Sequence, residues 1–201
     1  MFPALTPATR AIILVNVLVF VLEHVAMQPM LLHFALWPLG PDSLFHPWQL
    51  VTYAFLHDGV MHIFFNMFAL YVFGPALEQY WGPRRYLAYF FVCVIAAGAT
   101  QLGVQYVTAS PGATIGASGG IFGVLLAFAL LFPRARLLLY FAIPMPAWLF
   151  VSGYAVLELL FGVTGTEAGI AHFAHLGGML GGAIVMLYWR LRADRGGWRR
   201  S

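Results

Sequence analysis

Six apolar stretches, each close to the length that crosses a bilayer, constrain the fold of this chain more than any other feature. A bilayer's hydrocarbon core takes about 20 helical residues to cross. The expected spans are residues 11–27, 61–80, 86–107, 116–132, 147–163 and 169–191, and the fourth and fifth are short. Only 8% of the residues are charged, against about 25% in soluble domains. The sequence therefore predicts an all-α, polytopic membrane protein with six transmembrane helices in one domain, residues 1–201.

The basic residues predict how these spans are oriented, because all ten are arginine and none falls in an external loop of a six-span arrangement. They are Arg10, Arg84, Arg85, Arg134, Arg136, Arg190, Arg192, Arg195, Arg199 and Arg200. Basic loops mark the cytoplasmic face, so both termini are predicted to be cytoplasmic and the loop at residues 28–48 external. The net charge of +3 therefore reports membrane topology, and no nucleic-acid partner is predicted.

The segment Gly116-Ala117-Ser118-Gly119-Gly120 provides a candidate nucleophile at the start of the fourth span. A polar loop precedes it, so Ser118 is predicted to lie near a helix N-terminus, where free N–H groups favour an anion. Its own N–H could then bind the oxyanion that its attack creates. The alternatives are a small-residue helix contact or an N-cap serine. The nucleophile elbow of soluble hydrolases has the same Gly-x-Ser-x-Gly pattern, but it follows a strand, which is not expected here.

The sixth span provides a candidate base, His175, on a face that carries glycine. Gly178 and Gly182 follow it by three and seven residues, so they share its helical face. Glycines four residues apart let another helix approach closely, which predicts that His175 reaches Ser118 as a general base. The alternative is a histidine bonded to a backbone carbonyl, and His172 is predicted to lie nearer the external surface. Small residues on the fourth span would help this approach: Gly119, Gly120 and Gly123.

The second span begins with a third polar group. His62 and Asn66 are four residues apart and share a helical face, where both could donate hydrogen bonds to an oxyanion. The alternative is an interhelical polar contact. His57 and Gly59 belong to the turn before this helix and are interpreted as structural.

The remaining polar residues of the spans receive no functional role from the sequence. Glu23, His24 and Glu158 are interpreted as lying near span ends or alone. The single cysteine, Cys93, lies within an apolar span and is predicted to be a small buried side chain.

Taken together, these motifs resemble those of a bacterial rhomboid protease of the minimal six-helix form, over nearly all of the chain. The resemblance rests on four segments: Trp48-Gln49 through His57, His62-x-x-x-Asn66, Gly116-Ala117-Ser118-Gly119, and Ala174-His175-x-x-Gly178-x-x-x-Gly182. It implies a rhomboid-like bundle in which a short fourth helix carries the nucleophile.

The resemblance also implies roles for the site residues. Ser118 is the implied nucleophile and His175 the general base, without a third acidic member. The Ser118 N–H, His62 and Asn66 form the implied oxyanion site, and Gly116 shapes the loop. Gly178 and Gly182 support the approach of the helices.

Three further positions match or depart from the family pattern. Phe122 matches the residue whose aromatic ring packs on the catalytic imidazole. Glu78 matches a polar anchor at the cytoplasmic end of the second helix. The first-loop motif often reads Trp-Arg, whereas this chain has Trp48-Gln49, which leaves the loop's lipid contacts open.

The implied function is intramembrane serine endopeptidase activity, with a Ser-His dyad that cleaves transmembrane segments and needs no cofactor or metal. Substrates would be membrane proteins whose transmembrane helices unwind locally, and the expected location is a bacterial plasma (inner) membrane. Substrate would enter beside the fifth helix. There Ile143-Pro144-Met145-Pro146, with Trp148 and Phe150, suggests either a mobile gate or fixed loop packing.

Two other functions stay open at this point. Four histidines, His57, His62, His172 and His175, could ligate haem or a metal in a membrane bundle. The chain could also be an inactive rhomboid-like protein that only binds membrane helices, although it retains both Ser118 and His175.

Overall fold

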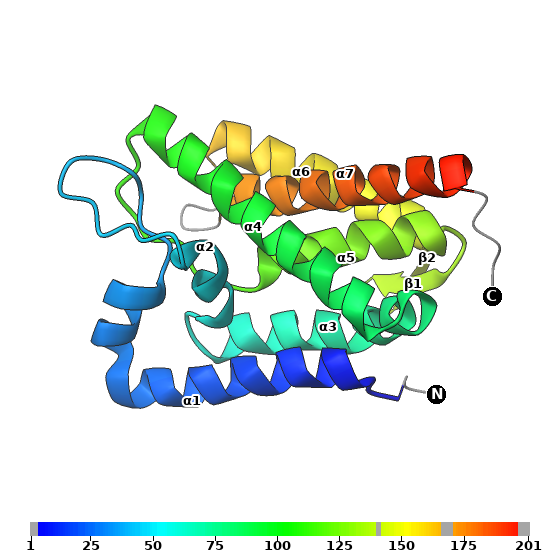
Figure 1. Ribbon diagram of the computed structural model, residues 1–201, viewed down its shortest axis with the longest axis horizontal. Helices are drawn as coiled ribbons and strands as arrows, with labels where there is room; N and C mark the ends of the chain where they lie inside the picture. The colour runs from blue at the N-terminus through cyan, green and yellow to red at the C-terminus, as the bar shows by residue number, and fades with distance from the viewer. Residues whose placement is uncertain (1–3, 140–141, 166–170, 197–201) are drawn as a thin grey trace.

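A computed structural model describes residues 4–139, 142–165 and 171–196, arranged as a bundle of helices (Figure 1). The long helices are α1 (Pro7–Phe34), α3 (Val60–Trp81), α4 (Pro83–Thr108), α5 (Ser118–Leu131), α6 (Ala147–Thr164) and α7 (His172–Gly196). The short elements are α2 (Gln49–Thr52), the 3-10 turn η1 (Tyr53–Phe55), β1 (Arg136–Leu139) and β2 (Ile143–Pro146). A helix lies in each of the six expected ranges, although residues 169 and 170 of the last one lie outside the described residues.

The helix lengths suit a membrane bundle. By length and composition, α1, α3, α4 and α6 can each cross a bilayer. The 14 residues of α5 make a helix only about 21 Å long, shorter than a hydrocarbon core of about 30 Å. The predicted class, an all-α polytopic membrane protein with a short fourth helix, is confirmed.

The arginine-bearing ends of the helices lie at one end of the bundle. The start of α1, the start of α4, the β1–β2 hairpin and the end of α7 all lie at the right of Figure 1. Arg10, Arg84, Arg136 and Arg190 belong to these segments. The clustering agrees with the predicted topology, and the face of the membrane that this end meets stays a prediction.

The first helix is longer than predicted and is broken. The sequence placed its end at Met27, whereas helical structure continues to Phe34 across a break at Ala26 (φ −138°, ψ 39°). Pro29 explains the break, because proline lacks an N–H and its ring clashes with the carbonyl four residues earlier. The predicted external loop therefore begins as a bent helical extension (Figure 1).

The short helix α5 packs against both α4 and α7, which also pack against each other. A methyl group on Gly119 would lie 2.4 Å from Cβ of Ala97, and one on Gly123 would lie 2.3 Å from Sγ of Cys93, both on α4. The expectation that the glycines of α5 serve its contact with α7 is therefore only partly right, since these two face mainly α4. Cys93 is fully buried, as predicted.

Glu78 fastens the start of α1 to the end of α3. Its carboxylate accepts hydrogen bonds from the N–H groups of Ala8 (2.8 Å) and Thr9 (2.7 Å) and from the hydroxyls of Thr9 (2.9 Å) and Thr6. An anion at a helix N-terminus satisfies free N–H groups and the helix dipole. This is the anchoring position that the family pattern implied for Glu78.

The segment that suggested a gate is a β-strand in this structure. β2 pairs with β1 in an antiparallel hairpin, from Arg136 opposite Pro146 to Leu139 opposite Ile143. The hairpin follows the C-terminal end of α5, whereas Ser118 is the first residue of that helix. The structure thus places this segment in a hairpin beyond the far end of α5 from Ser118, and the choice between a mobile gate and fixed packing stays a prediction.

Candidate active site

The loop before α5 is held by backbone hydrogen bonds to two other segments. Leu36 and Thr114 exchange N–H···O bonds of 3.0 and 2.9 Å, and the N–H of Gly116 donates to the carbonyl of Tyr53 (2.9 Å). Gly116 has φ +121°, which side-chain-bearing residues rarely adopt. The loop then turns into α5, whose N-cap is Ala117. Ser118 is therefore not the N-cap serine of the alternative interpretation, and its hydroxyl is left for another contact.

The hydroxyl of Ser118 meets the imidazole of His175. Nε2 of His175 lies 2.8 Å from Oγ of Ser118, which is hydrogen-bond distance. The ring of Phe122 stacks on His175 with centroids 4.3 Å apart and planes 6° apart, in the position that the family pattern implied. Ser118 is half-buried and His175 is 8% exposed, so the pair lies at the edge of the packed interior.

Gly178 makes this contact possible, whereas Gly182 has a different neighbour. A methyl group on Gly178 would lie 1.8 Å from the carbonyl oxygen of Gly119, so α7 and α5 touch through their backbones there. A methyl group on Gly182 would meet the Tyr89 hydroxyl of α4 at 2.3 Å. The glycine face of α7 is therefore shared between α5 and α4, where the sequence had assigned both glycines to the approach of α5.

The structure adds an acidic residue that the sequence analysis set aside. Glu158 of α6 is 7% exposed, and its Oε2 lies 2.7 Å from Nδ1 of His172 and 2.9 Å from Nδ1 of His175. The first contact is a well-formed hydrogen bond. The second is short but off-line, since Nδ1 of His175 makes no aligned hydrogen bond. The expectations that Glu158 stands alone and that His175 has no acidic neighbour are wrong. His172, which the sequence placed one turn nearer the external surface than His175, is the first residue of α7 and is buried.

On the other side of Ser118, His62 presents a donor. Nδ1 of His62 accepts a hydrogen bond from the N–H of Asp58 (3.2 Å), so in the neutral ring Nε2 carries the proton. A Cβ atom on Gly116 would lie 2.8 Å from that Nε2 and 3.8 Å from Oγ of Ser118. His62 and Ser118 therefore face the same spot above Gly116.

Asn66 lies one turn further along α3 and is buried. Its Nδ2 donates to the carbonyl of His62 at 2.9 Å, a bond within one helix rather than the interhelical contact that was the alternative. That bond uses one of its two amide hydrogens. The other hydrogen is the one that an oxyanion could accept.

His57 and Glu23 hold the turn before α3 against α1. The fully buried His57 donates its backbone N–H to both carboxylate oxygens of Glu23, each at 3.2 Å. This agrees with the structural interpretation of His57 and gives Glu23 a partner that the sequence analysis missed. Burial lowers the pKa of the His57 imidazole to about 4, so the ring is neutral at physiological pH.

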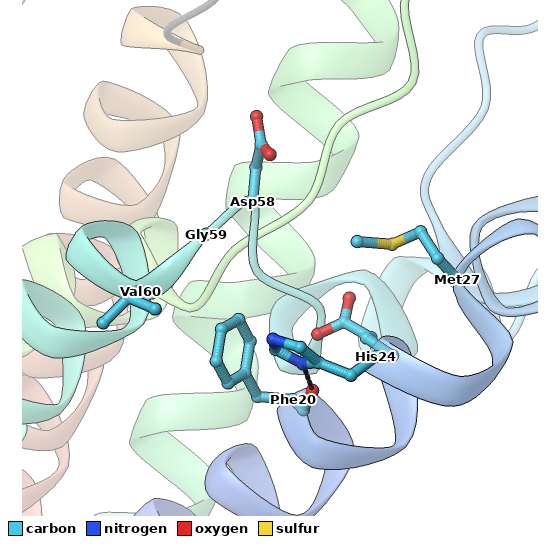
Figure 2. A pocket seen from close by; sticks show the side chains of 7 residues that line it. Phe20, His24, Met27, Asp58, Gly59 and Val60 are labelled. Atoms are coloured by element: carbon cyan, nitrogen blue, oxygen red, sulfur yellow. Dashed lines mark hydrogen bonds between the residues drawn. The ribbon is translucent and has the colours of Figure 1, made fainter.

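A pocket of about 340 Å³ lies beside this turn, between α1 and the start of α3. Figure 2 shows Phe20, His24 and Met27 of α1 on one side and Asp58 to Val60 on the other. Nδ1 of the exposed His24 bonds the carbonyl of Phe20 at 2.9 Å. The pocket is thus separate from the Ser118–His175 contact.

Gln49 explains how the first loop closes without the arginine of the usual motif. Its fully buried amide donates to the carbonyls of Leu44 (2.9 Å) and His33 (3.4 Å), and it accepts the N–H of Trp37 (3.3 Å). Trp48 is half exposed and bonds the same His33 carbonyl at 2.9 Å. In this chain Gln49 therefore ties the loop together internally.

The only described group of residues that offers a metal three ligand atoms is Glu158, His172 and His175, with the atoms within 4.8 Å of one another. Two ligands of one tetrahedral zinc ion, each about 2.0–2.1 Å from it, would lie about 3.3 Å apart. The contacts of 2.7 and 2.9 Å are instead hydrogen-bond distances. The four histidines of the haem or metal alternative do not form one ligand set among the described residues, because His57 and His62 lie outside this group.

A family model described as the Rhomboid domain matches residues 44–192. The chain belongs to the rhomboid family. The match covers every residue of the candidate site, from His57 to Gly182, so the site lies within the family's shared domain.

Curated relatives of this rhomboid come from organelles and from bacteria. It is 31% identical to RHOMBOID-like protein 12, mitochondrial, of Arabidopsis thaliana over 92% of its own length and 58% of the relative's. It is 32% identical to Rhomboid protein 1, mitochondrial, of Saccharomyces cerevisiae over 70% of this chain and 41% of that protein. It is 25% identical to Rhomboid protease GlpG of Serratia proteamaculans over 92% of this chain and 63% of that protein. This rhomboid therefore spans less than two thirds of the length of each of these relatives. Its family and its long apolar helices make it an integral membrane protein.

Proposed function

We propose that this rhomboid is an intramembrane serine endopeptidase that cleaves transmembrane segments, with Ser118 as nucleophile and His175 as general base. The observation that carries the proposal is the 2.8 Å contact between Nε2 of His175 and Oγ of Ser118 at the first turn of α5. A serine hydroxyl is a weak nucleophile until an adjacent base takes its proton. Ser118 is half-buried, so part of the residue is exposed.

The reaction follows the chemistry of acyl transfer. Nε2 of His175 accepts the Ser118 proton as Oγ bonds to the carbonyl carbon of the substrate peptide. The tetrahedral intermediate collapses when the protonated His175 gives that proton to the leaving nitrogen, which breaks the C–N bond. A water molecule, deprotonated by His175, then releases the acyl group and restores Ser118.

The oxyanion of the intermediate would be bound from two sides. The N–H of Ser118 lies at the start of α5, where the helix dipole also favours negative charge. Nε2–H of His62 faces the same spot, and Asn66 offers its second amide hydrogen. Donors preorganised in this way act only on charge that develops during the reaction.

The substrate would be a membrane protein whose transmembrane helix unwinds locally, because a peptide bond inside a stable helix is not open to attack. The positive-inside pattern of the arginines supports cytoplasmic termini and a site toward the external half of the membrane. A bacterial plasma membrane is the proposed location, with a mitochondrial membrane the alternative that two of the relatives suggest.

A fluorophosphonate probe tests the nucleophile directly. We expect the purified protein in detergent to be labelled, labelling to vanish in Ser118→Ala, and its rate to fall at least about 10³-fold in His175→Ala. Ser152→Ala is the matched control, since that serine is exposed on α6.

Labelling that persists in Ser118→Ala would overturn the assignment of the nucleophile. A wild-type protein that is never labelled, and does not cleave a single-pass substrate with a Gly-Pro break in its helix, would instead favour an inactive rhomboid that only binds helices.

A further inference from the structure

One carboxylate oxygen contacts both histidines of α7. Oε2 of Glu158 lies 2.7 Å from Nδ1 of His172 and 2.9 Å from Nδ1 of His175. The three side chains are each exposed by 10% or less. A carboxylate buried to this extent needs donors; His172 supplies an aligned one, and His175 lies close enough for electrostatic attraction.

The contact with His175 is on the ring nitrogen that does not face Ser118. A carboxylate oxygen 2.9 Å from Nδ1 repels a lone pair there and attracts an N–H, so this contact favours the ring proton on Nδ1. Nε2 of the neutral ring is then the acceptor for the Ser118 hydroxyl, 2.8 Å away. The position of Glu158 thus selects the tautomer that a general base requires.

The same carboxylate also offsets the charge that the base acquires. When His175 takes a proton it becomes a cation at a site with little solvent, and an uncompensated charge there is costly. Coulomb attraction depends on distance rather than on N–H alignment, so the off-line geometry does not remove it. Among the described neighbours of His175, Phe122 stacks on the face of its ring and is uncharged, and His62 is an imidazole. Glu158 is the neighbour that carries a negative charge.

We infer that Glu158 is a positioning residue for His175 and that His172 positions Glu158, which makes a relay of three side chains behind Ser118. This inference rests on the proposed function. His172 holds Oε2 through the aligned bond, and His172 and His175, three residues apart, lie on one face of α7. α6 and α7 thus both contribute to the base, where the family pattern implied only a dyad.

Steady-state cleavage of a model transmembrane substrate in proteoliposomes tests the relay. We expect Glu158→Gln, which removes the charge and keeps the shape, to lower kcat about 10²-fold with KM unchanged. This decrease is smaller than the drop in kcat of about 10⁴-fold seen when the acidic residue of a well-aligned Ser-His-Asp triad is neutralised. Glu158→Asp should recover part of the activity, and His172→Asn should lower kcat by about 10-fold or less.

Two controls separate positioning from mere stability. Glu78→Gln removes another buried carboxylate that accepts hydrogen bonds, at the opposite end of α3 from His62, and should lower the melting temperature with kcat retained. The double variant Glu158→Gln/His172→Asn should be no slower than Glu158→Gln alone, because His172 acts through Glu158. Wild-type kcat in Glu158→Gln, or effects that simply add in the double variant, would overturn the inference.

A spectroscopic readout keeps the inference testable if the protein cleaves nothing. The ¹⁵N spectrum of selectively labelled His175 should show the proton on Nδ1 in the wild type and a mixture of tautomers in Glu158→Leu. A proton on Nε2 in the wild type contradicts the relay whether or not the chain is a protease.

Discussion

Two groups of side chains, each with one glutamate and two histidines, lie on either side of Ser118, and all but the half-buried His62 are buried. On the α3 side Glu23 accepts the backbone N–H of His57, and within the described part of the chain no carboxylate bonds to a ring nitrogen of His57 or His62. On the α7 side Glu158 contacts the ring nitrogens of His172 and His175 directly. The residue types are the same, but the carboxylate touches backbone in one group and imidazole in the other.

This difference assigns the groups different chemistry. An imidazole whose Nδ1 accepts a backbone N–H, as in His62, is neutral and presents a donor. An imidazole beside a carboxylate can hold a proton as a cation. The α3 group therefore suits oxyanion binding and the α7 group suits proton transfer, so environments rather than residue types separate the two roles.

The broadest effect, on both activity and stability, is expected from separating the α7 group from Ser118. In Gly178→Ala the added methyl group would meet the Gly119 carbonyl oxygen at 1.8 Å, so the two backbones must move apart. We expect probe labelling to fall by at least about 10²-fold, since a displacement of about 1 Å can cost that much. The melting temperature should also fall, because overpacking costs about 1–3 kcal/mol.

Gly153→Ala is the matched control, because a methyl group on that glycine of α6 meets no atom within 4 Å. It should leave labelling unchanged. Normal labelling in Gly178→Ala would show that the His175–Ser118 contact does not depend on this backbone approach.

The next effect is expected in the α3 group. His62→Ala removes the proposed donor, and kcat should fall about 10²–10³-fold while KM changes little. His62→Gln keeps an N–H donor and should recover part of the rate. His24→Ala, at an exposed histidine of α1, should have no effect. Unchanged kcat in His62→Ala would mean that the α3 group is structural only.

The smallest effect concerns His57 and appears only on acidification. Burial lowers its pKa from 6.5 to about 4, so between these values the unfolded chain binds a proton that the folded chain does not. Stability is therefore lost as the pH falls through this window. From pH 7.5 to 5.5 the loss is about 1.4 kcal/mol, or about 3–5 °C in melting temperature.

Thermal unfolding in detergent across this pH range measures the effect, with His57→Asn as the variant that should lose the His57 share of the dependence. Identical pH profiles for both proteins would contradict the buried, neutral state of His57.

Much of the fold could be predicted from the sequence. The length of each apolar stretch has to match the thickness of the bilayer, so the stretches locate the helices. The positions of the arginines indicate which helix ends lie together. The predicted ranges and the observed helices agree within a few residues, except at α1. In α1, Pro29 could either end the helix or kink it, and the local sequence does not distinguish these two outcomes. The hairpin of β1 and β2 also lacked a clear signal, since two prolines lie within β2.

The site could be predicted where each residue has a local motif. Ser118 follows a Gly-containing loop, and His175 shares its register with Gly178. Glu158 was missed because nothing next to it on α6 is polar and its partners belong to another helix. A signal did exist: a lone acid within an apolar span requires a partner, and two histidines three residues apart on the next helix offer one.

The pair of backbone bonds between Leu36 and Thr114 has a mechanical consequence. Leu36 follows the bent end of α1, and Thr114 precedes Gly116 and Ser118 by only a few residues. A force on the first loop, such as a change in bilayer thickness would exert, would thus reach Ser118 through these two backbone hydrogen bonds. It would not have to pass through the packed helices. The amide hydrogens of Leu36 and Thr114 should accordingly exchange with solvent deuterium in step.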